Sequence, residues 1–306
     1  MLLPAALFRA QRKALLAKLD TRPDREEIVS RAHYYNRLLA EKQPIKLPAT
    51  APRVSQQRLG KKSHVYFFDT REYLRYFPKD CRWLHIPGDI TTVPSFPSIV
   101  KSRPIEQPNA NSVLLNLNKV RHFIFVKNDI PYEAKCPRAC FRGKIRDKPK
   151  RIRLFEKYFG NPMVDLGDTS SQLKQVKQAW GVAPMSIREQ LSFKFLLAIE
   201  GTDVASNLKW IMSSNSIAVM PRPQYETWFQ EGLLRPGVHY IEIAPDYSDL
   251  VEKLQYYIDH PDEALAIIHA AHEWVARFHD PMREKLVSLL VLQNYFIATG
   301  QEEFLE

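Results

Sequence analysis

The sequence lacks any long apolar run and contains few cysteines. A membrane-spanning helix needs roughly 20 consecutive apolar residues, and none of the apolar runs in this 306-residue sequence approaches that length. The opening stretch MLLPAALF is followed by Arg9, Arg12 and Lys13, which reverses the charge order of a secretory signal. Three cysteines are too few to cross-link a chain of this size. We therefore expect a globular, cytoplasmic protein.

Motifs of several protein classes are also missing. The sequence has no dinucleotide-binding G-x-G-x-x-G and no P-loop, which argues against a dehydrogenase and an ATPase. It has no zinc finger, zipper or ribonucleoprotein signature, so we expect no nucleic-acid partner. The formal net charge of +10 still indicates a polyanionic partner, such as a phosphate-bearing lipid or a nucleotide ligand. The densest basic run, Arg142 to Arg153, fits a solvated surface equally well.

Two groups of possible metal ligands are weak. Cys136 and Cys140 form a C-x3-C pair without a second pair nearby. His269 and His272 share one face of a predicted helix, with His279 further along, but a solvated helical face explains them as well. We therefore expect neither a metal nor another cofactor.

The order of elements predicts an α/β protein. Residues 5–42 read as helices, and a proline-rich polar connection follows. Short apolar runs begin at His64, and two of them, HVYFFD at 64–69 and HFIFVK at 122–127, are predicted to be buried strands. Strands and helices alternate after Pro137. This pattern favours two α/β domains that face a cleft, with a junction near residues 132–140.

One unit of this pattern suggests a binding site. The apolar run from Phe195 to Ile199 predicts a strand that meets a turn at Glu200 and Gly201. Thr202 and Asp203 are suitable N-caps for a helix that would end near Ser214. Such a turn lies at the carboxyl edge of an α/β sheet, where a helix N-terminus can bind an anion. A packing unit without a ligand is the alternative.

Several long segments then show a resemblance to a known family. CFRGK, FKFLLAIEGTDVASNLKWIMSSNSIAVM and WFQEGLLRPGVHYIEIAPDYSDLVEKLQYYIDHPDEA resemble glycosyltransferase family 90. The similarity is greater to bacterial lipopolysaccharide glycosyltransferases than to eukaryotic protein O-glucosyltransferases, and it covers roughly residues 64–280. The resemblance implies a GT-B architecture of two Rossmann-like domains, a UDP-hexose donor, inversion at the anomeric carbon and no need for a metal.

Domain ranges follow from the pattern and the resemblance together. The predicted ranges are an N-terminal helical extension and linker at 1–62, an acceptor-side α/β domain at 63–135, a nucleotide-sugar donor domain at 136–285 and a C-terminal helix at 286–306.

The resemblance also implies roles for individual residues. Asp89, in GDITTVP, matches the family's general base, although a turn-capping Asp would look the same. Arg142 and Gly143 match a family turn that contacts the donor diphosphate, and Glu189 matches a residue for sugar or ribose hydroxyls. The full set of predicted donor-binding residues is Arg142, Gly143, Lys144, Glu189, Lys194, Gly201, Thr202, Asp203, Asn207 and Lys209.

One position departs from the family. Eukaryotic members have an arginine where this sequence has Asn207, so another cation must neutralise the diphosphate. Lys209 and Lys194 on the donor side are candidates. Lys101 and Arg103, predicted to contact the acceptor or a phosphate, are two more.

These observations predict an inverting hexosyltransferase. The expected reaction moves glucose or galactose from a UDP-sugar to a hydroxyl of the lipopolysaccharide or lipooligosaccharide core. Transfer to a capsular polysaccharide or a protein, and a non-catalytic polyanion-binding role, are the alternatives. The N-terminal amphipathic helix is expected either to pack on the protein's own core or to contact the inner face of the inner membrane peripherally.

Overall fold

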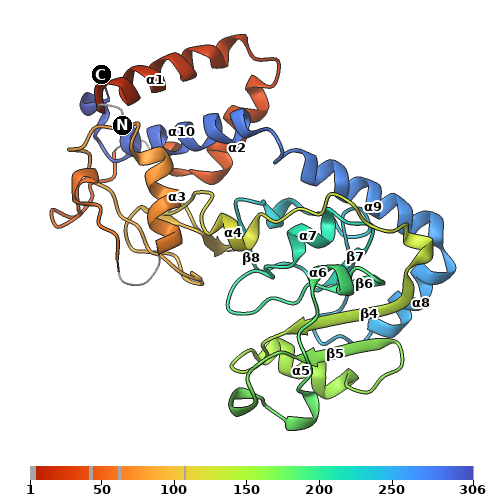
Figure 1. Ribbon diagram of the computed structural model, residues 1–306. Helices are drawn as coiled ribbons and strands as arrows, with labels where there is room; N and C mark the ends of the chain where they lie inside the picture. The colour runs from red at the N-terminus through yellow and green to blue at the C-terminus, as the bar shows by residue number, and fades with distance from the viewer. Residues whose placement is uncertain (1–4, 41–43, 61–63, 107, 306) are drawn as a thin grey trace. The chain divides into compact units, whose positions relative to one another are not determined.

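The computed structural model describes residues 5–40, 44–60, 64–106 and 108–305, and the chain divides into two compact units (Figure 1). Unit 1 contains residues 1–120, 225–229 and 278–306, and unit 2 contains residues 121–224 and 230–277. The boundaries of these compact units differ from those of the predicted domains, whose functional assignments remain predictions. The difference arises because two later segments of the chain pack with the first 120 residues.

Unit 2 is built on a five-stranded sheet in which every pairing is parallel. Its spatial order is β5-β4-β6-β7-β9. The strands are β4 (Cys136–Gly143), β5 (Val164–Asp168), β6 (Phe193–Leu197), β7 (Ile217–Met220) and β9 (Ile241–Glu242). Apart from the half-buried Lys194, the residues of β6 and β7 are apolar and buried, as expected for strands covered on both faces.

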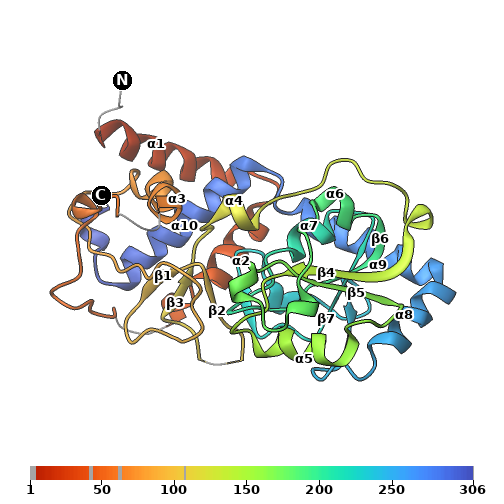
Figure 2. The same ribbon diagram turned by 60° about the horizontal axis from the view of Figure 1, so that its bottom comes forward.

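Helices connect these strands and cover the sheet (Figures 1 and 2). They are α5 (Pro149–Tyr158), α6 (Ile187–Gln190), α7 (Leu208–Met212), α8 (Leu250–Asp259) and α9 (Pro261–Ala276). Leu154 and Phe155 of α5 and Leu254 of α8 join Phe195 and Val219 of the sheet in one buried cluster. The α9 helix begins with Pro261 at its first position, where proline is favoured.

The strand order defines a switch point in unit 2. The chain starts in β4, moves to β5 on one side, and then returns to β6 on the other side of β4. In open parallel sheets, ligands bind outside the carboxyl ends of the strands at such a reversal. The ends of β4 and β6 are therefore the place where the fold favours a ligand.

Unit 1 is mainly helical. Its helices are α1 (Ala5–Ala17), α2 (Arg25–Tyr35), α3 (His64–Leu74) and α10 (Pro281–Ala298), and α4 (Lys119–His122) spans its boundary with unit 2. In the described part of unit 1, β1 (Ser98–Val100) pairs parallel with β3 (Ser112–Leu114), and β2 (Ser102–Pro104) pairs antiparallel with β8 (Tyr225–Thr227). The mixed α/β class is confirmed, but the described strands of unit 1 do not form a second Rossmann-like sheet.

Polar and aromatic groups lie together in the core of unit 1. Arg31 is 2% exposed and forms an ion pair with Glu284 at 2.6 Å. The rings of Tyr35 and Trp228 stack with centroids 3.9 Å apart. The segments at 225–229 and 278–306 thus supply partners for buried residues of α2.

Two predicted strands are absent. HVYFFD forms the first part of the helix α3, whose buried residues Tyr66, Thr70 and Tyr73 recur at helical spacing. A window of six residues is too short to distinguish the helical period of about 3.6 residues from the strand period of about 2. In HFIFVK, His122 ends α4 and the following residues are irregular, with Ile124 40% exposed. The N–H of Val126 donates to the Ser213 hydroxyl rather than to a neighbouring strand.

Candidate functional site

Arg151 bridges the ends of the two strands at the switch point of unit 2. This α5 residue donates from Nη1 to the carbonyl of Lys144, directly after β4, at 2.9 Å. It donates from Nη2 to the carbonyl of Ile199, after β6, at 2.8 Å. A Cβ added to Gly201 would lie 3.1 Å from Nη2, so glycine permits this close approach. The guanidinium therefore lies where the topology favours a ligand.

The charge of Arg151 has no carboxylate partner among the residues that the structure describes. Burial, with a smaller contribution from the positive charge of Arg121, lowers the pKa of Arg151 to about 10. The group remains protonated at neutral pH but is poorly compensated. An anion at this edge would supply the missing negative charge.

Two lysines from the same basic segment contact the turn after β6. Lys148 Nζ donates to the Thr202 hydroxyl, and Lys150 Nζ pairs with Glu200. The other carboxylate oxygen of Glu200 accepts from the Gln224 N–H at 2.9 Å. Glu200 is thus neutralised by Lys150, which removes one source of repulsion toward a diphosphate.

The turn itself is not the N-terminus of a helix, so that expectation was wrong. The α7 helix begins at Leu208 and has five residues, with Asn207 as an N-cap whose side chain makes no capping bond. Asn207 Nδ2 donates instead to the carbonyl of Leu197 at 3.1 Å. The Gly201 N–H bonds to the carbonyl of Asp203, which is 1% exposed. The chain folds back on itself here and begins α7 only after this irregular turn.

Arg142 points along the sheet rather than out from its edge. Its Nη2 lies 2.8 Å from Asp165 Oδ1, and its Nη1 donates to the Asp165 carbonyl at 3.0 Å. A Cβ on Gly167 would lie 2.8 Å from Arg142 Cδ, so the side chain covers β5. Gly143 and the exposed Lys144 do lie at the carboxyl edge. The geometry thus gives Arg142 a packing role and leaves its predicted diphosphate contact unsupported.

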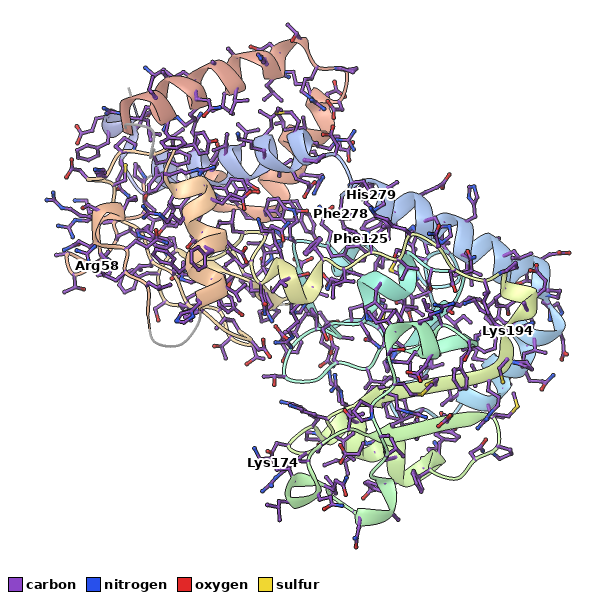
Figure 3. The ribbon with its side chains drawn as sticks, viewed as in Figure 1. Arg58, Phe125, Lys174, Lys194, Phe278 and His279 are labelled. Atoms are coloured by element: carbon purple, nitrogen blue, oxygen red, sulfur yellow. The ribbon has the colours of Figure 1, made fainter. Side chains whose placement is uncertain are left out.

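Lys209 and Lys194 do not reach this edge. Lys209 is fully buried and pairs with Glu231, which is 1% exposed. Lys194 lies at the beginning of β6, since Phe193 is opposite Cys136 at the start of β4. Its Nζ is 4.4 Å from the centroid of the Tyr132 ring, and Figure 3 places it at the opposite end of β4 from Lys174.

Glu189 also lies on the amino side of the sheet. It forms a capping box with Ser186 at the start of α6, before β6 begins. Hydrogen bonds from Ser186 lower the pKa of the Glu189 carboxyl group. These contacts explain Glu189 as a helix cap and do not place it with Arg151.

The sequence-based prediction did not include the cations at this edge, although the sequence indicates them. Lys148, Lys150 and Arg151 belong to the basic run that fits a solvated surface. In a parallel sheet, however, the loop after the first strand emerges at the carboxyl edge. A basic run placed directly after β4 is therefore expected at the switch point.

Asp89 lies in unit 1, in a loop held by two buried neighbours. Lys101 Nζ is 2.6 Å from Asp89 Oδ1, and the side chains are 1% and 27% exposed, respectively. Gly88 has φ +108°, a conformation that favours glycine directly before the carboxylate. The Ser102 hydroxyl both donates to the carbonyl and accepts from the N–H of Ile90 at 3.2 Å. Asp89 is an oriented, partly exposed carboxylate, as a general base requires.

Arg103 has a structural role, which does not support the predicted phosphate contact. The side chain is 0% exposed, and its Nε lies 2.8 Å from Glu226 Oε1. Its Nη1 donates to the carbonyls of Tyr35 and Ser112, and its Nη2 donates to that of Tyr34. All three nitrogens are used inside unit 1.

The weak metal candidates remain dispersed. Within the described ranges, no group of three or more His, Cys, Asp or Glu residues is arranged to hold a metal ion. His272 Nε2 is 2.9 Å from the Ser214 carbonyl, and burial raises the pKa of the Cys140 thiol to about 12. None of the described helices is long and apolar enough to cross a membrane.

Comparison with known proteins gives this site its context. The model of glycosyl transferase family 90 matches residues 113–288, which include the whole sheet of unit 2. The chain belongs to this family of glycosyltransferases. It is 40% identical over 297 residues to the O-glucosyltransferase LpsA of Dichelobacter nodosus, covering 96% of this chain and 91% of that protein.

Eukaryotic relatives are more distant. The chain is 33% identical over 153 residues to protein O-glucosyltransferase 2 of Danio rerio, which is 48% of this chain and 30% of that protein. It is 28% identical over 165 residues to human protein O-glucosyltransferase 3, or 53% of this chain and 32% of that protein. These alignments cover about a third of each longer eukaryotic protein.

Proposed function

We propose that this glycosyltransferase is an inverting enzyme of GT-B type that transfers a hexose, glucose or galactose, from a UDP-sugar to a hydroxyl of the lipopolysaccharide or lipooligosaccharide core. The observation that carries the proposal is the position of Arg151. A protonated side chain without a carboxylate partner in the described chain joins the ends of β4 and β6, where the fold favours a nucleotide ligand. Family membership supports sugar transfer.

Charge neutralisation at the leaving group is the role proposed for the edge of unit 2. When the bond between the anomeric carbon and the diphosphate breaks, the UDP oxygen receives the electron pair. Arg151, together with Lys148 beside Thr202, would stabilise that charge. Gly143 and Gly201 allow the Arg151 guanidinium to lie close to the backbone at this edge.

Asp89 is the proposed general base. It would take the proton of the acceptor hydroxyl as the oxygen attacks the anomeric carbon from the side opposite the UDP. Lys101 holds one carboxylate oxygen and so orients the group. The transfer involves no change of oxidation state, and Asp89 holds the released proton until it passes to solvent. No metal or other cofactor is part of this mechanism.

The acceptor is proposed from charge and from the relatives. A formal net charge of +10 suits a phosphorylated or acidic acceptor, and the relative that aligns along most of its length is a bacterial O-glucosyltransferase. The proposed location is the cytoplasm, with peripheral contact at the inner face of the inner membrane. A protein acceptor is the second candidate, since the eukaryotic relatives are named protein O-glucosyltransferases.

Release of UDP tests the proposal. Purified protein would be incubated with UDP-glucose or UDP-galactose and a truncated core oligosaccharide. We expect UDP formation that depends on the acceptor, and a core product heavier by one hexose in the mass spectrum. Transfer to protein but not to the core would support the second candidate. Absence of UDP release with either UDP-sugar and any core or protein acceptor would refute the proposed reaction.

A further inference from the structure

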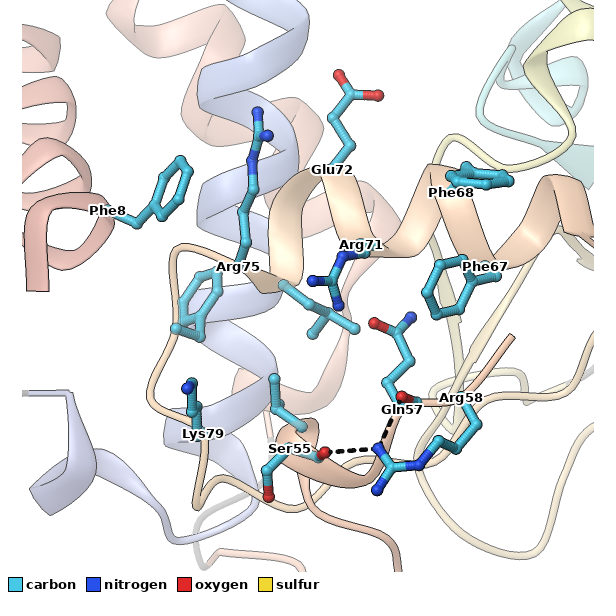
Figure 4. Close-up of a pocket in the computed structure, with 13 residues that line it drawn as sticks. Phe8, Ser55, Gln57, Arg58, Phe67, Phe68, Arg71, Glu72, Arg75 and Lys79 are labelled. Atoms are coloured by element: carbon cyan, nitrogen blue, oxygen red, sulfur yellow. Dashed lines mark hydrogen bonds between the residues drawn. The ribbon is translucent and has the colours of Figure 1, made fainter. Parts of the chain in front are cut away.

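Unit 1 contains a pocket of about 720 Å³ that the proposed transfer does not use (Figure 4). Its walls come from Phe8 of α1, the segment at 54–58, the α3 helix and the residues that follow it. The walls contain both aromatic side chains, such as Phe8, Phe67 and Phe68, and cationic ones. Such side chains favour a ligand that has both an anionic group and an apolar part.

Four exposed cations line the pocket. Arg58, Arg71, Arg75 and Lys79 have no carboxylate partner among the described residues. Two of them are positioned by aromatic rings instead. The Arg75 guanidinium lies 4.9 Å from the centroid of Phe8, and that of Arg71 lies 5.7 Å from the centroid of Phe67.

The remaining polar contacts leave the positive charge uncompensated. Arg58 Nη1 donates to the carbonyls of Ser55 and Gln57 at 3.0 and 3.2 Å. Glu72 also lines the pocket, but it pairs with Lys119, and Figure 4 shows its carboxylate directed away from Arg58 and Lys79. The pocket thus presents a net positive field to any ligand.

Apolar side chains project beside these cations. Phe68 is 60% exposed and lines the pocket, and Leu59, next to Arg58, is 53% exposed. Large apolar groups at this exposure are unfavourable in water. They gain free energy when they enter the interface of a bilayer, where neighbouring basic residues pair with lipid phosphates.

We propose that this pocket binds the phosphate-bearing headgroup of an anionic lipid at a membrane surface. Arg71 contacts the phosphate and Arg75 adds positive charge beside Phe8, while Phe68 and Leu59 enter the lipid interface. A soluble phosphate would use the same guanidinium groups but would leave Phe68 in water. The apolar side chains therefore favour a lipid. The proposal deepens the peripheral membrane contact proposed above, and its test does not depend on sugar transfer.

Vesicle flotation tests this inference. Full-length protein would be mixed with phosphatidylcholine vesicles with and without phosphatidylglycerol. We expect binding only with the anionic lipid. Arg71→Gln combined with Arg75→Gln should lower the partition coefficient on the order of tenfold or more. Phe68→Ser, which keeps the charge, should lower it by about tenfold.

A matched control separates the pocket from general charge. Lys174→Gln with Arg188→Gln removes the same charge from exposed positions outside the pocket and should leave flotation nearly unchanged. An unchanged thermal unfolding midpoint would show that each variant is folded. The inference would be overturned if the pocket variants float like the wild type, or if the control pair loses as much. Wild-type flotation of Phe68→Ser, with soluble glycerol phosphate abolishing binding, would also overturn it by indicating a soluble-anion site.

Discussion

Lys101 Nζ lies 2.6 Å from Asp89 Oδ1, so a buried ammonium group holds a partly exposed carboxylate in place. This arrangement leads to the first prediction. Asp89→Asn keeps the size of the side chain and removes its ability to accept the acceptor proton. We expect kcat to fall by on the order of 10²- to 10⁴-fold while UDP affinity is retained. Asp80→Asn, at an exposed position in the same unit, is the control. Near wild-type turnover in Asp89→Asn would exclude the proposed base.

Arg151 and Arg142 can be distinguished by nucleotide binding. Arg151→Gln removes the cation at the switch point and should raise the Kd for UDP by roughly 10- to 100-fold, the range for a charged hydrogen-bond partner. Arg142→Ala breaks the ion pair with Asp165 and should mainly lower stability. Calorimetry with UDP and thermal unfolding measure the two effects. If only Arg142→Ala weakens UDP binding, the sequence-based assignment is right and the proposed role of Arg151 is wrong.

Gly201 offers a steric test of the same edge. A Cβ at this position would lie 3.1 Å from Arg151 Nη2, so Gly201→Ala must displace the guanidinium slightly. We expect several-fold weaker UDP binding with little change in the unfolding midpoint. Gly160→Ala is a useful contrast. No atom lies within 4 Å of its added Cβ, so any effect there comes from its φ of +85° and should appear in stability alone.

The pair of Lys209 and Glu231 should behave as a structural element. Lys209→Met leaves a buried carboxylate without this cation and should lower the free energy of unfolding by about 3–5 kcal/mol. Replacing both residues, with Lys209→Met and Glu231→Leu, should restore much of the loss. Urea unfolding measures both effects. A stable Lys209→Met protein that no longer binds UDP would instead return Lys209 to the list of donor contacts.

His85 predicts a pH dependence of stability in unit 1. Burial lowers its pKa to about 4, so the folded protein keeps this ring neutral while the unfolded chain protonates near pH 6.5. Between these values the unfolded state binds more protons, and stability falls as the pH decreases from about 6.5 to 4. The contribution should be about 1–3 kcal/mol. His85→Phe preserves a ring beside Trp83 and should flatten this part of the urea-unfolding profile. An unchanged slope would contradict the assignment.

The sequence predicted the fold of unit 2 better than the details of its candidate site. The apolar run at Phe195 forms a buried strand as predicted, since it is short and is followed by a turn at Gly201. Local side-chain choices are harder to predict. Asp203 is a good N-cap by type, yet the chain turns back at Gly201 and the helix begins later. Arg142 matches a family motif, yet Asp165 on the next strand binds it, and no local pattern reveals that partner.

Unit 1 is assembled from three separate segments of the chain, which affects how it folds during synthesis. Arg31 and Tyr35 belong to α2, but their partners Glu284 and Trp228 are translated much later. The uninterrupted stretch at 121–224 contains four of the five strands of the large sheet. A ribosome-bound chain therefore exposes an incomplete first unit until α10 leaves the exit tunnel. The α2 helix can therefore finish packing only after α10 has been made.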